Sequence, residues 1–481
     1  MKTLLSFVTL CFACIVTVSA SEPKLEIAWG ERDTVYLANH HVVGVTNPDA
    51  VASINGEKLH VYKTGCFGKT VTLSPGNNKV TVAVVKGADT ATKVLDVYYE
   101  TTPRKRSANA EEQTVKLEQP VNIMTVEGAY LQYGNGGDRL GGSKMGYLVP
   151  GVPMTAIGET SSLYEVKLSE YRTAYVPKEY VTAGGDGAKC VNTGSWSVSN
   201  DGKTDKVVIS LPYRLPYYYR DAINPLEIRV SLYGVMNNSN WITQRSALGI
   251  IDFVDFEQTD SDVLTAVIRL KDKHSWGYSI EYEGNKLVIK VRHRPESLAL
   301  KDLKIGLDAG HGTKNPGAIS ASGLKEADIN IDIVNRLAEL LKKAGAEVVL
   351  SRTADTDATM AERRKIFRDA NIDLLISVHN NAVDNPFASL GTSTYYKHIS
   401  NRELAHTLCE SMLTLGVNLY GVTGNFNFSL NQPTEYPNAL VEGLFMSSLE
   451  EEELLANPDY RQKMAQKIFE GLKNYLKACQ K

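Results

Sequence analysis

Lys304-Ile-Gly-Leu-Asp-Ala-Gly-His-Gly312 is the stretch from which the architecture of the C-terminal region can be inferred. It starts with an apolar run that predicts a buried strand, and the glycines that follow allow a sharp turn. In open α/β sheets, ligands bind in the crevice beyond the carboxyl ends of the strands. We therefore expect His311 to lie at such a crevice, although a single histidine at a strand end is often just an exposed polar residue.

Three stretches further along the chain place more polar residues at the same predicted edge. Glu326 begins a segment with apolar residues at helical spacing, so it lies in the first turn of a helix. A second apolar strand ends in His379, and a short third strand carries Glu442 next to a glycine. Two histidines and a glutamate around an open crevice are typical of a catalytic zinc site, where a second glutamate can act as the base.

The region from about residue 304 to 475 resembles the zinc-dependent N-acetylmuramoyl-L-alanine amidases, which cut bacterial peptidoglycan. The matching stretches follow the order and spacing of that family, and they are Leu307–Gly312, Gly323–Glu326, Ser351–Arg352, Ile376–Asn380 and Leu440–Gly443. The resemblance implies a Zn²⁺ ion held by His311, Glu326 and His379, with Glu442 as the catalytic glutamate. It also implies peptidoglycan as the substrate, cut at the amide between N-acetylmuramic acid and L-alanine of the stem peptide.

The sequence departs from the family at three places. Asn380 stands where the family often has a small residue, Gln432 lies nearest the place of a common arginine, and Leu444 separates Gly443 from Phe445. These departures concern substrate fit and rate, because none of them removes a ligand.

Several polar residues near these motifs allow two interpretations. Asp308 is expected either to accept a hydrogen bond from a ligand imidazole or to cap the following turn. Arg352 and Asn380 are expected either to contact substrate or to have structural roles at the sheet edge. His398 and His406 lie in the same region but outside the motifs, so we treat them, like the five histidines upstream, as surface or structural residues.

Strands and helices alternate in residues 300–481, which predicts an open, twisted sheet covered by helices on both faces. Capping boxes at Thr359–Glu362, Ser400–Glu403 and Ser448–Glu451 predict three helix starts. About a dozen residues separate His379 from the next predicted strand, too few for an inserted helix that blocks the zinc, since stable helices run about 8–20 residues. We therefore expect the isolated catalytic region to be active without an activator. A regulatory protein partner, if there is one, is unknown.

Three small all-β modules are expected ahead of the catalytic domain. Residues 22–100 resemble bacterial immunoglobulin-like sandwiches, residues 101–113 form a polar linker, and residues 114–185 resemble bacterial SH3-like domains. Residues 188–296 form a β-rich module that resembles the wall-targeting domains of some amidases. Its tyrosine cluster at Pro212–Tyr219 suits a satellite core better than a sugar-stacking surface.

The N-terminus predicts export. Lys2 precedes an apolar stretch, Leu4–Val18, and small residues up to Ala20 match a signal-peptidase site, so residues 1–20 are expected to be removed and the protein to be periplasmic or secreted. A lipoprotein anchor at Cys14 is the alternative, but the residues before it fit a lipobox poorly. The remaining cysteines are scattered, which indicates buried or free thiols and leaves a disulfide open: Cys66, Cys190, Cys409 and Cys479.

Charge and composition exclude some partners. The formal net charge of −3 over 481 residues gives no strong attraction to nucleic acid or to an anionic surface. Beyond the N-terminal stretch, the sequence has no apolar segment that predicts a membrane span. Two alternative functions stay open. One is a zinc peptidase that acts on another cell-wall amide, and the other is a non-catalytic peptidoglycan-binding protein on an amidase fold.

Overall fold

The computed structural model describes residues 23–102, 112–138, 141–187, 189–353 and 356–480. The predicted signal peptide and Cys14 lie outside these residues. The chain divides into two compact units, residues 1–103 and 104–481, which are taken one at a time below. Among the described residues, no helix is both long and apolar enough to span a membrane. The four described cysteines are not in disulfides, and only Cys190 is exposed.

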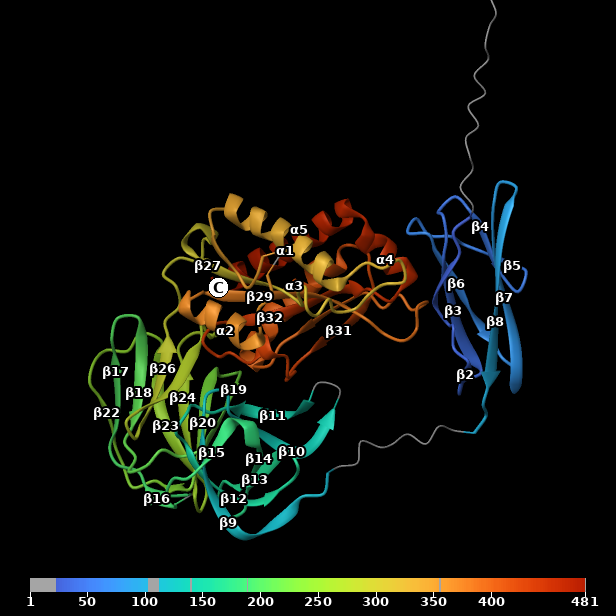
Figure 1. Ribbon diagram of the computed structural model, residues 1–481. Helices are drawn as coiled ribbons and strands as arrows, with labels where there is room; N and C mark the ends of the chain where they lie inside the picture. The colour runs from blue at the N-terminus through green and yellow to red at the C-terminus, as the bar shows by residue number, and fades with distance from the viewer. Residues whose placement is uncertain (1–22, 103–111, 139–140, 188, 354–355, 481) are drawn as a thin grey trace, which may run out of the picture. The chain divides into compact units, whose positions relative to one another are not determined.

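The first unit consists of two β-sheets around a small apolar core (Figure 1). The smaller sheet has the order β1 (Glu26–Trp29), β3 (Asn39–Val45), β6 (Cys66–Thr72). The larger has the order β2 (Thr34–Val35), β8 (Asp89–Tyr99), β7 (Gly76–Lys86), β4 (Val51–Ile54), β5 (Glu57–Leu59). Val42 and Phe67 from the first sheet pack with Val80 and Val82 from the second, because alternate residues of each strand point inward. This is the packing of a β-sandwich.

The second unit begins with four sheets. A seven-stranded sheet has the order β11 (Gly141–Tyr147), β10 (Tyr130–Asp138), β14 (Thr173–Pro177), β13 (Leu163–Lys167), β12 (Pro153–Glu159), β9 (Val115–Thr125), β15 (Val181–Ala183). The others are β16 (Val191–Asn192) with β21 (Val235–Met236); β22 (Ile242–Gln244), β17 (Trp196–Asn200), β18 (Thr204–Ile209), β26 (Lys286–Arg292), β25 (Tyr278–Glu283); and β19 (Tyr217–Ala222), β20 (Glu227–Tyr233), β24 (Val263–Leu270), β23 (Ile251–Asp260). Their buried side chains, from Ile123 to Val291, form one continuous cluster, so residues 114–185 and 188–296 share a core.

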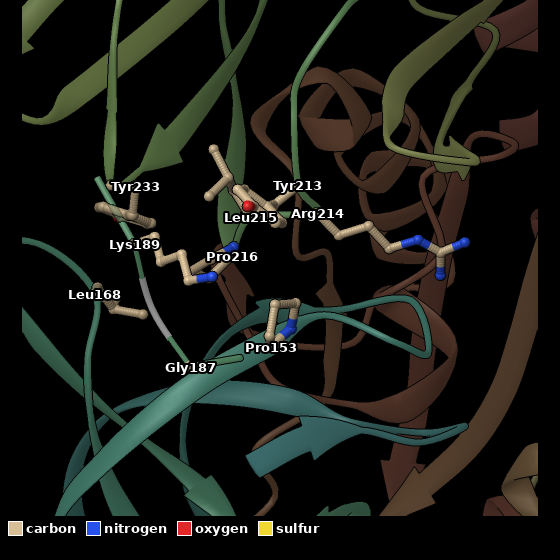
Figure 2. A pocket seen from close by; sticks show the side chains of 10 residues that line it. Pro153, Leu168, Gly187, Lys189, Tyr213, Arg214, Leu215, Pro216 and Tyr233 are labelled. Carbon is tan, nitrogen blue, oxygen red and sulfur yellow. The ribbon is translucent and has the colours of Figure 1, made fainter. Parts of the chain in front are cut away.

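The tyrosine cluster is divided between this core and the surface. Tyr217 and Tyr219 are buried in the shared cluster, in agreement with the core interpretation. Tyr213 is exposed and, with Pro153, Lys189 and other residues, lines a shallow pocket (Figure 2). The part of the cluster that reaches the surface is therefore Tyr213 together with the half-buried Tyr218, whose ring contacts that of Tyr133.

The catalytic region is built on a six-stranded sheet. Its order is β28 (Glu347–Leu350), β27 (Lys304–Ala309), β29 (Leu374–Asn381), β32 (Asn438–Phe445), β30 (Thr392–Tyr395), β31 (Leu419–Thr423). The first four strands are parallel, whereas β30 runs antiparallel to β32 and parallel to β31. The carboxyl ends of β27, β29 and β32 therefore meet at one edge, together with the first residues of β30 and β31.

Helices cover both faces of this sheet (Figure 1). The helices are α1 (Glu326–Lys343), α2 (Met360–Asp369), α3 (Arg402–Leu413), α4 (Leu449–Ala456) and α5 (Pro458–Ala478), with 3₁₀ turns at Lys178–Tyr180, Leu300–Asp302, Ile399–Asn401 and Ser429–Asn431. Helices α1, α3 and α5 pack on the face that presents Leu374 and Ile376. Helix α2 covers the opposite face, where its Phe367 packs with Leu375. The predicted α/β fold, preceded by a β-rich region, is confirmed.

The three predicted capping boxes have different outcomes. Thr359 and Glu362 form the complete box at the start of α2. Ser448 caps α4 by accepting from the Glu451 amide, but the Glu451 carboxylate accepts from the backbone of Gly391 and Phe445 instead. The predicted capping box at Ser400–Glu403 is wrong, because α3 begins at Arg402 after a 3₁₀ turn. The Ser400 hydroxyl instead donates to Asp221 of the β-rich region.

The β-rich region joins the catalytic sheet at the amino ends of its central strands. The Tyr278 amide donates to the Thr434 carbonyl at 2.7 Å, shortly before β32, and Arg292 pairs with Asp373 just before β29. Trp276 is buried in the catalytic core itself. These contacts lie at the amino ends of the strands. The carboxyl ends of β27, β29 and β32 lie at the opposite edge of the sheet.

His274 strengthens this junction through two carboxylates. Its Nε2 lies 2.9 Å from Glu403 and its Nδ1 lies 3.4 Å from Asp272. The hydrogen bond with Asp272 is the largest of several contacts that together raise the pKa of His274 to about 10. Since the folded-state pKa exceeds the ordinary value of 6.5, this stabilisation is complete below pH 6.5 and is lost as the pH rises through about 10.

We expect His274→Gln to lower the free energy of unfolding by about 1.5–3 kcal/mol at pH 6, because hydrogen bonds to charged groups are lost. The difference from the wild type should shrink above pH 10. Urea unfolding at both pH values measures it, with His406→Gln as the control. An equal difference in unfolding free energy at the two pH values would contradict a stabilising interaction of protonated His274 with Asp272 and Glu403.

Candidate functional site

His311 lies on the turn that follows β27, in the left-handed conformation with φ of +62°. Such a backbone costs a non-glycine residue about 1–3 kcal/mol and persists only where the surroundings impose it. A Cβ atom at the neighbouring Gly310 would lie 2.2 Å from the ring of His379, so only glycine lets this turn approach β29. The tight turn brings the His311 imidazole beside that of His379, with ring centroids 5.0 Å apart.

Glu326 is the first residue of α1 and stands between the two imidazoles. Its Oε2 lies 3.1 Å from His311 Nε2, and its Oε1 lies 3.0 Å from His379 Nδ1. The backbone amides of Ala318 and Asn380 also donate to this carboxylate, at 3.0 and 3.2 Å. The start of a helix favours a negative charge, so the position holds Glu326 ionised although it is buried.

His379 and Glu442 lie side by side on neighbouring strands. They are paired in the register of β29 and β32, and partners in a parallel pair point to the same face of the sheet. Burial opposes the charged form of His379, but Glu326 and Glu442 outweigh this and raise the pKa of His379 to about 9. Burial likewise opposes the charged form of Glu326, yet hydrogen bonds from His311 and His379 lower the pKa of its carboxyl.

The structure therefore brings together all four residues that the sequence singled out. One ligand atom from each of His311, Glu326 and His379 lies within 4.8 Å of the others, and these three form the His/Cys/Asp/Glu group found at metal-binding spacing among the described residues. Glu442 adjoins this group through the strand register and is almost fully buried. The other histidines lie elsewhere; His398, for example, hydrogen-bonds the Gln432 carbonyl at 2.9 Å.

A buried ion pair that sequence reasoning missed holds the turn of His311. Arg363 of α2 lies 2.7 Å from Asp308 and also donates to the Ala309 and His311 carbonyls. Asp308 accepts in addition from Ser377, at 2.6 Å, so neither expected role of Asp308 is observed. Burial alone would raise the pKa of Asp308, but Arg363 holds it below its usual value. The sequence did contain a signal for this pair. Arg363 lies four residues before the apolar Phe367, so both lie on the same face of α2, and that face is buried.

Arg363→Met should destabilise the protein by about 3–5 kcal/mol, because it leaves the Asp308 carboxylate buried without its counter-charge. Arg368→Met on the same helix is the matched control, since its ion pair with Glu435 is half exposed and contributes about 0–1 kcal/mol. Urea unfolding of the two variants compares the losses. Equal losses would show that Arg363 is no more important than a surface arginine.

Comparison with known proteins adds sequence evidence to this geometry. Residues 305–474 match the family described as N-acetylmuramoyl-L-alanine amidase. The germination-specific N-acetylmuramoyl-L-alanine amidase of Bacillus subtilis is 30% identical over 201 residues, which cover 38% of this chain and 83% of that enzyme. The chain belongs to this amidase family. The prediction that it is an enzyme, an N-acetylmuramoyl-L-alanine amidase, is thereby confirmed.

Other amidases match the same part of the chain. The N-acetylmuramoyl-L-alanine amidase LytC of Bacillus subtilis is 33% identical over 176 residues, which cover 36% of this chain but only 35% of that protein. The solved structure of the amidase AmiC2 of Nostoc punctiforme is 31% identical, with a TM-score of 0.35 and coverage of 36% of this chain and 97% of that one. The β-rich residues ahead of position 304 lie outside the family match.

Asn380 and Gln432, two of the three departures from the amidase pattern, are buried, and so is Arg352, which belongs to a matching stretch. The Asn380 side chain is buried, where it donates to Asn330 at 2.8 Å and accepts from the Leu444 amide at 3.1 Å. Arg352 is also buried and donates to three backbone carbonyls, those of Ala309, Gly310 and Ala327. The hydrogen bonds of both residues support the structural role at the sheet edge. Gln432 is buried as well, beside Asn427.

The amidase site is partly open to solvent. The side chains of His311 and His379 are 24% and 19% exposed. The structure has no helix between β29 and β30, as predicted, within a stretch that it describes completely. Activity without an activator stays a prediction. Because Trp276 belongs to the catalytic core, residues 104–481 are a better fragment for that test than a fragment beginning near residue 300.

Proposed function

We propose that this amidase hydrolyses the amide between N-acetylmuramic acid and L-alanine in peptidoglycan, with Zn²⁺ bound by His311, Glu326 and His379 and with Glu442 as the general base. The observation that carries the proposal is the spacing of the three ligand atoms, within 4.8 Å of one another, beside a buried glutamate on the next strand. Family membership supports the substrate class, and the geometry supports the proposed roles of these residues.

The donor set suits zinc. Two imidazole nitrogens and one carboxylate oxygen are a common set for a catalytic zinc ion, which keeps one position open for water or substrate. Backbone amides orient the Glu326 carboxylate, and Gly310 lets the two imidazoles approach closely. When bound, zinc would lower the pKa of a water molecule and polarise the scissile carbonyl.

Glu442 would perform the proton transfers. Its carboxylate would take a proton from the attacking water and later deliver it to the nitrogen of the leaving L-alanine. The strand register fixes Glu442 between His379 and Ser393, so its position relative to the ligands is set by the sheet and not by a flexible loop. Its burial removes competing solvent and strengthens the electrostatic interactions inside the site.

The proposed site of action is the bacterial cell wall. We propose that residues 1–20 act as a signal peptide and that the amidase is periplasmic or secreted, which would bring it to peptidoglycan. The balanced charge of the chain gives no long-range attraction to the wall, so local contacts must position it.

Mass spectrometry of purified peptidoglycan after incubation with the protein tests the proposed function. We expect free stem peptides that begin with L-alanine and glycan chains without peptide. A chelator should abolish their release, and added zinc should restore it. Fragments cut inside the stem peptide would support a zinc peptidase instead, and binding without any product would support a non-catalytic wall-binding protein.

A further inference from the structure

Exposed apolar side chains of the catalytic region gather around one edge of its sheet. The large ones among the described residues from 304 to 480 are Ile319, Met360, Phe387, Leu419 and Tyr420. They lie before α1, at the start of α2, after β29 and at the start of β31, all on the side where β27, β29 and β32 end. Leu419 and Tyr420 are adjacent in the chain, at the start of the edge strand β31, so they expose apolar surface next to each other.

The two sides of this edge differ in charge. On the β31 side, residues 411–434 contain no Asp, Glu, Lys or Arg. On the side of α1, the loop before Glu326 carries Lys314 and Lys325, and Asp357 accepts from the Lys314 amide. The first side is thus poor in charge, with Glu450 at its rim, where it accepts from Ser389 next to Asn418. A surface with few charges suits sugar hydroxyl and acetamido groups, whereas charged groups suit a peptide with free carboxylates and amines.

Tyr420 presents a ring that is fixed on one side and open on the other. It is 48% exposed, and it packs edge-to-face against the buried Phe445 with ring centroids 5.1 Å apart. Phe445 follows Glu442 by three residues on β32, and β31 is the edge strand of the sheet. The ring therefore packs on the strand that carries the proposed general base, and about half of its side chain is open to solvent.

Hydroxyl groups lie between Tyr420 and Glu442. Ser393 is the register partner of Glu442, and the Ser393 hydroxyl lies 3.4 Å from that of Tyr395. Glu442 and Tyr420 both raise the pKa of Tyr395, after the larger effect of burial, which agrees with Tyr395 lying between them. Ser393 and Tyr395 are buried, so the exposed ring of Tyr420 is the group of this cluster that can contact the apolar face of a sugar.

We propose that the exposed surface around Tyr420 and its neighbour Leu419, at the start of the edge strand β31, binds the glycan side of the substrate. The muramoyl sugar then lies over β31, and the stem peptide extends toward residues 312–325. This inference rests on the proposed function, because it assigns the two sides of the scissile amide to the two sides of the metal-binding group. The occupant is an uncharged glycan, chosen by the absence of charge in residues 411–434 and by continuity with Glu442.

Kinetics on two soluble substrates test the assignment with the full chain. One substrate is a stem peptide attached to the N-acetylglucosaminyl-N-acetylmuramic acid disaccharide, and the other is the same peptide attached to lactate alone. The ratio of kcat/KM for the first to the second measures how much the sugar contributes. Tyr420→Ala should lower this ratio about tenfold, as expected for a lost ring contact. Tyr420→Phe should change it less than about twofold, since it keeps the ring.

Tyr171→Ala is the matched control, because Tyr171 is an exposed tyrosine of the β-rich region. An unchanged ratio in Tyr420→Ala, or an equal fall in Tyr171→Ala, overturns the proposal. Binding of the peptide-free disaccharide, followed by NMR, separates this result from the proposed function, because it needs no hydrolysis. Disaccharide that binds the wild type and not Tyr420→Ala supports the subsite whichever bond is cut, and disaccharide that binds both equally overturns it.

Discussion

Glu442→Gln should lower kcat/KM by about 10²–10⁴-fold, the usual effect of losing a general base. Glutamine has nearly the same shape as glutamate but cannot accept the proton of the attacking water. The side chain is buried on a central strand, next to His379 in register, so an amide of the same size should leave the fold and the metal content unchanged. The loss should appear in kcat as well as in kcat/KM, since proton transfer belongs to the transition state.

Release of stem peptide, zinc content and thermal unfolding, measured on the same preparation, test this prediction. Glu410→Gln on the exposed face of α3 is the matched control and should behave like the wild type. Near-normal turnover with a full complement of zinc would remove Glu442 from the mechanism. Loss of zinc along with activity would instead give Glu442 a role in holding the metal.

The centre of the catalytic fold could be predicted because its strands carry a strong local pattern. Strands β27, β29 and β32 are parallel and buried on both faces, so each is a nearly continuous apolar run. Polar residues at the ends of such runs must lie at one sheet edge, which is why His311, His379 and Glu442 could be placed together before any coordinates existed. Glu326 followed from the start of a strongly periodic helix.

Contacts between residues far apart in the chain could not be predicted in this way. The Ser400 hydroxyl donates to Asp221 rather than capping α3, and no pattern near residue 400 shows that β19 lies beside it. The partner of Asp308 could not be predicted either. It is Arg363 of α2, the helix on the sheet face opposite to α1, α3 and α5. A short side chain or a carboxylate can satisfy several local patterns, and tertiary packing decides which of them is used.

The β-rich region shows the same limit on a larger scale. Alternating residues predicted its strands, but the order of the sheets depends on pairing across long separations, such as β18 with β26. The buried side chains of residues 114–185 and 188–296 form one cluster, although the sequence predicts them as two separate modules. The assignment of these residues to SH3-like and wall-targeting modules stays a prediction.

His379→Ala should weaken zinc binding by more than the 10–100-fold that is typical when a group outside the ligand sphere is lost. The substitution removes one of three donors and leaves the buried Glu326 carboxylate with His311 as its only imidazole partner among the ligands. Elemental analysis after gel filtration should show about one zinc per wild-type chain and far less in the variant. His406→Ala, in the same region but outside the ligand group, should keep its zinc.

Thermal unfolding gives a second readout that does not depend on catalysis. A metal that binds only the folded state stabilises it by RT ln(1 + [L]/Kd), about 2.7 kcal/mol when zinc is present at 100 times its Kd. Added zinc should therefore raise the Tm of the metal-stripped wild type and of His406→Ala but have little effect on His379→Ala. Stoichiometric zinc in His379→Ala, with a normal rise in Tm, would mean that the metal lies elsewhere and that the pairing of His379 with Glu326 is an ordinary hydrogen bond.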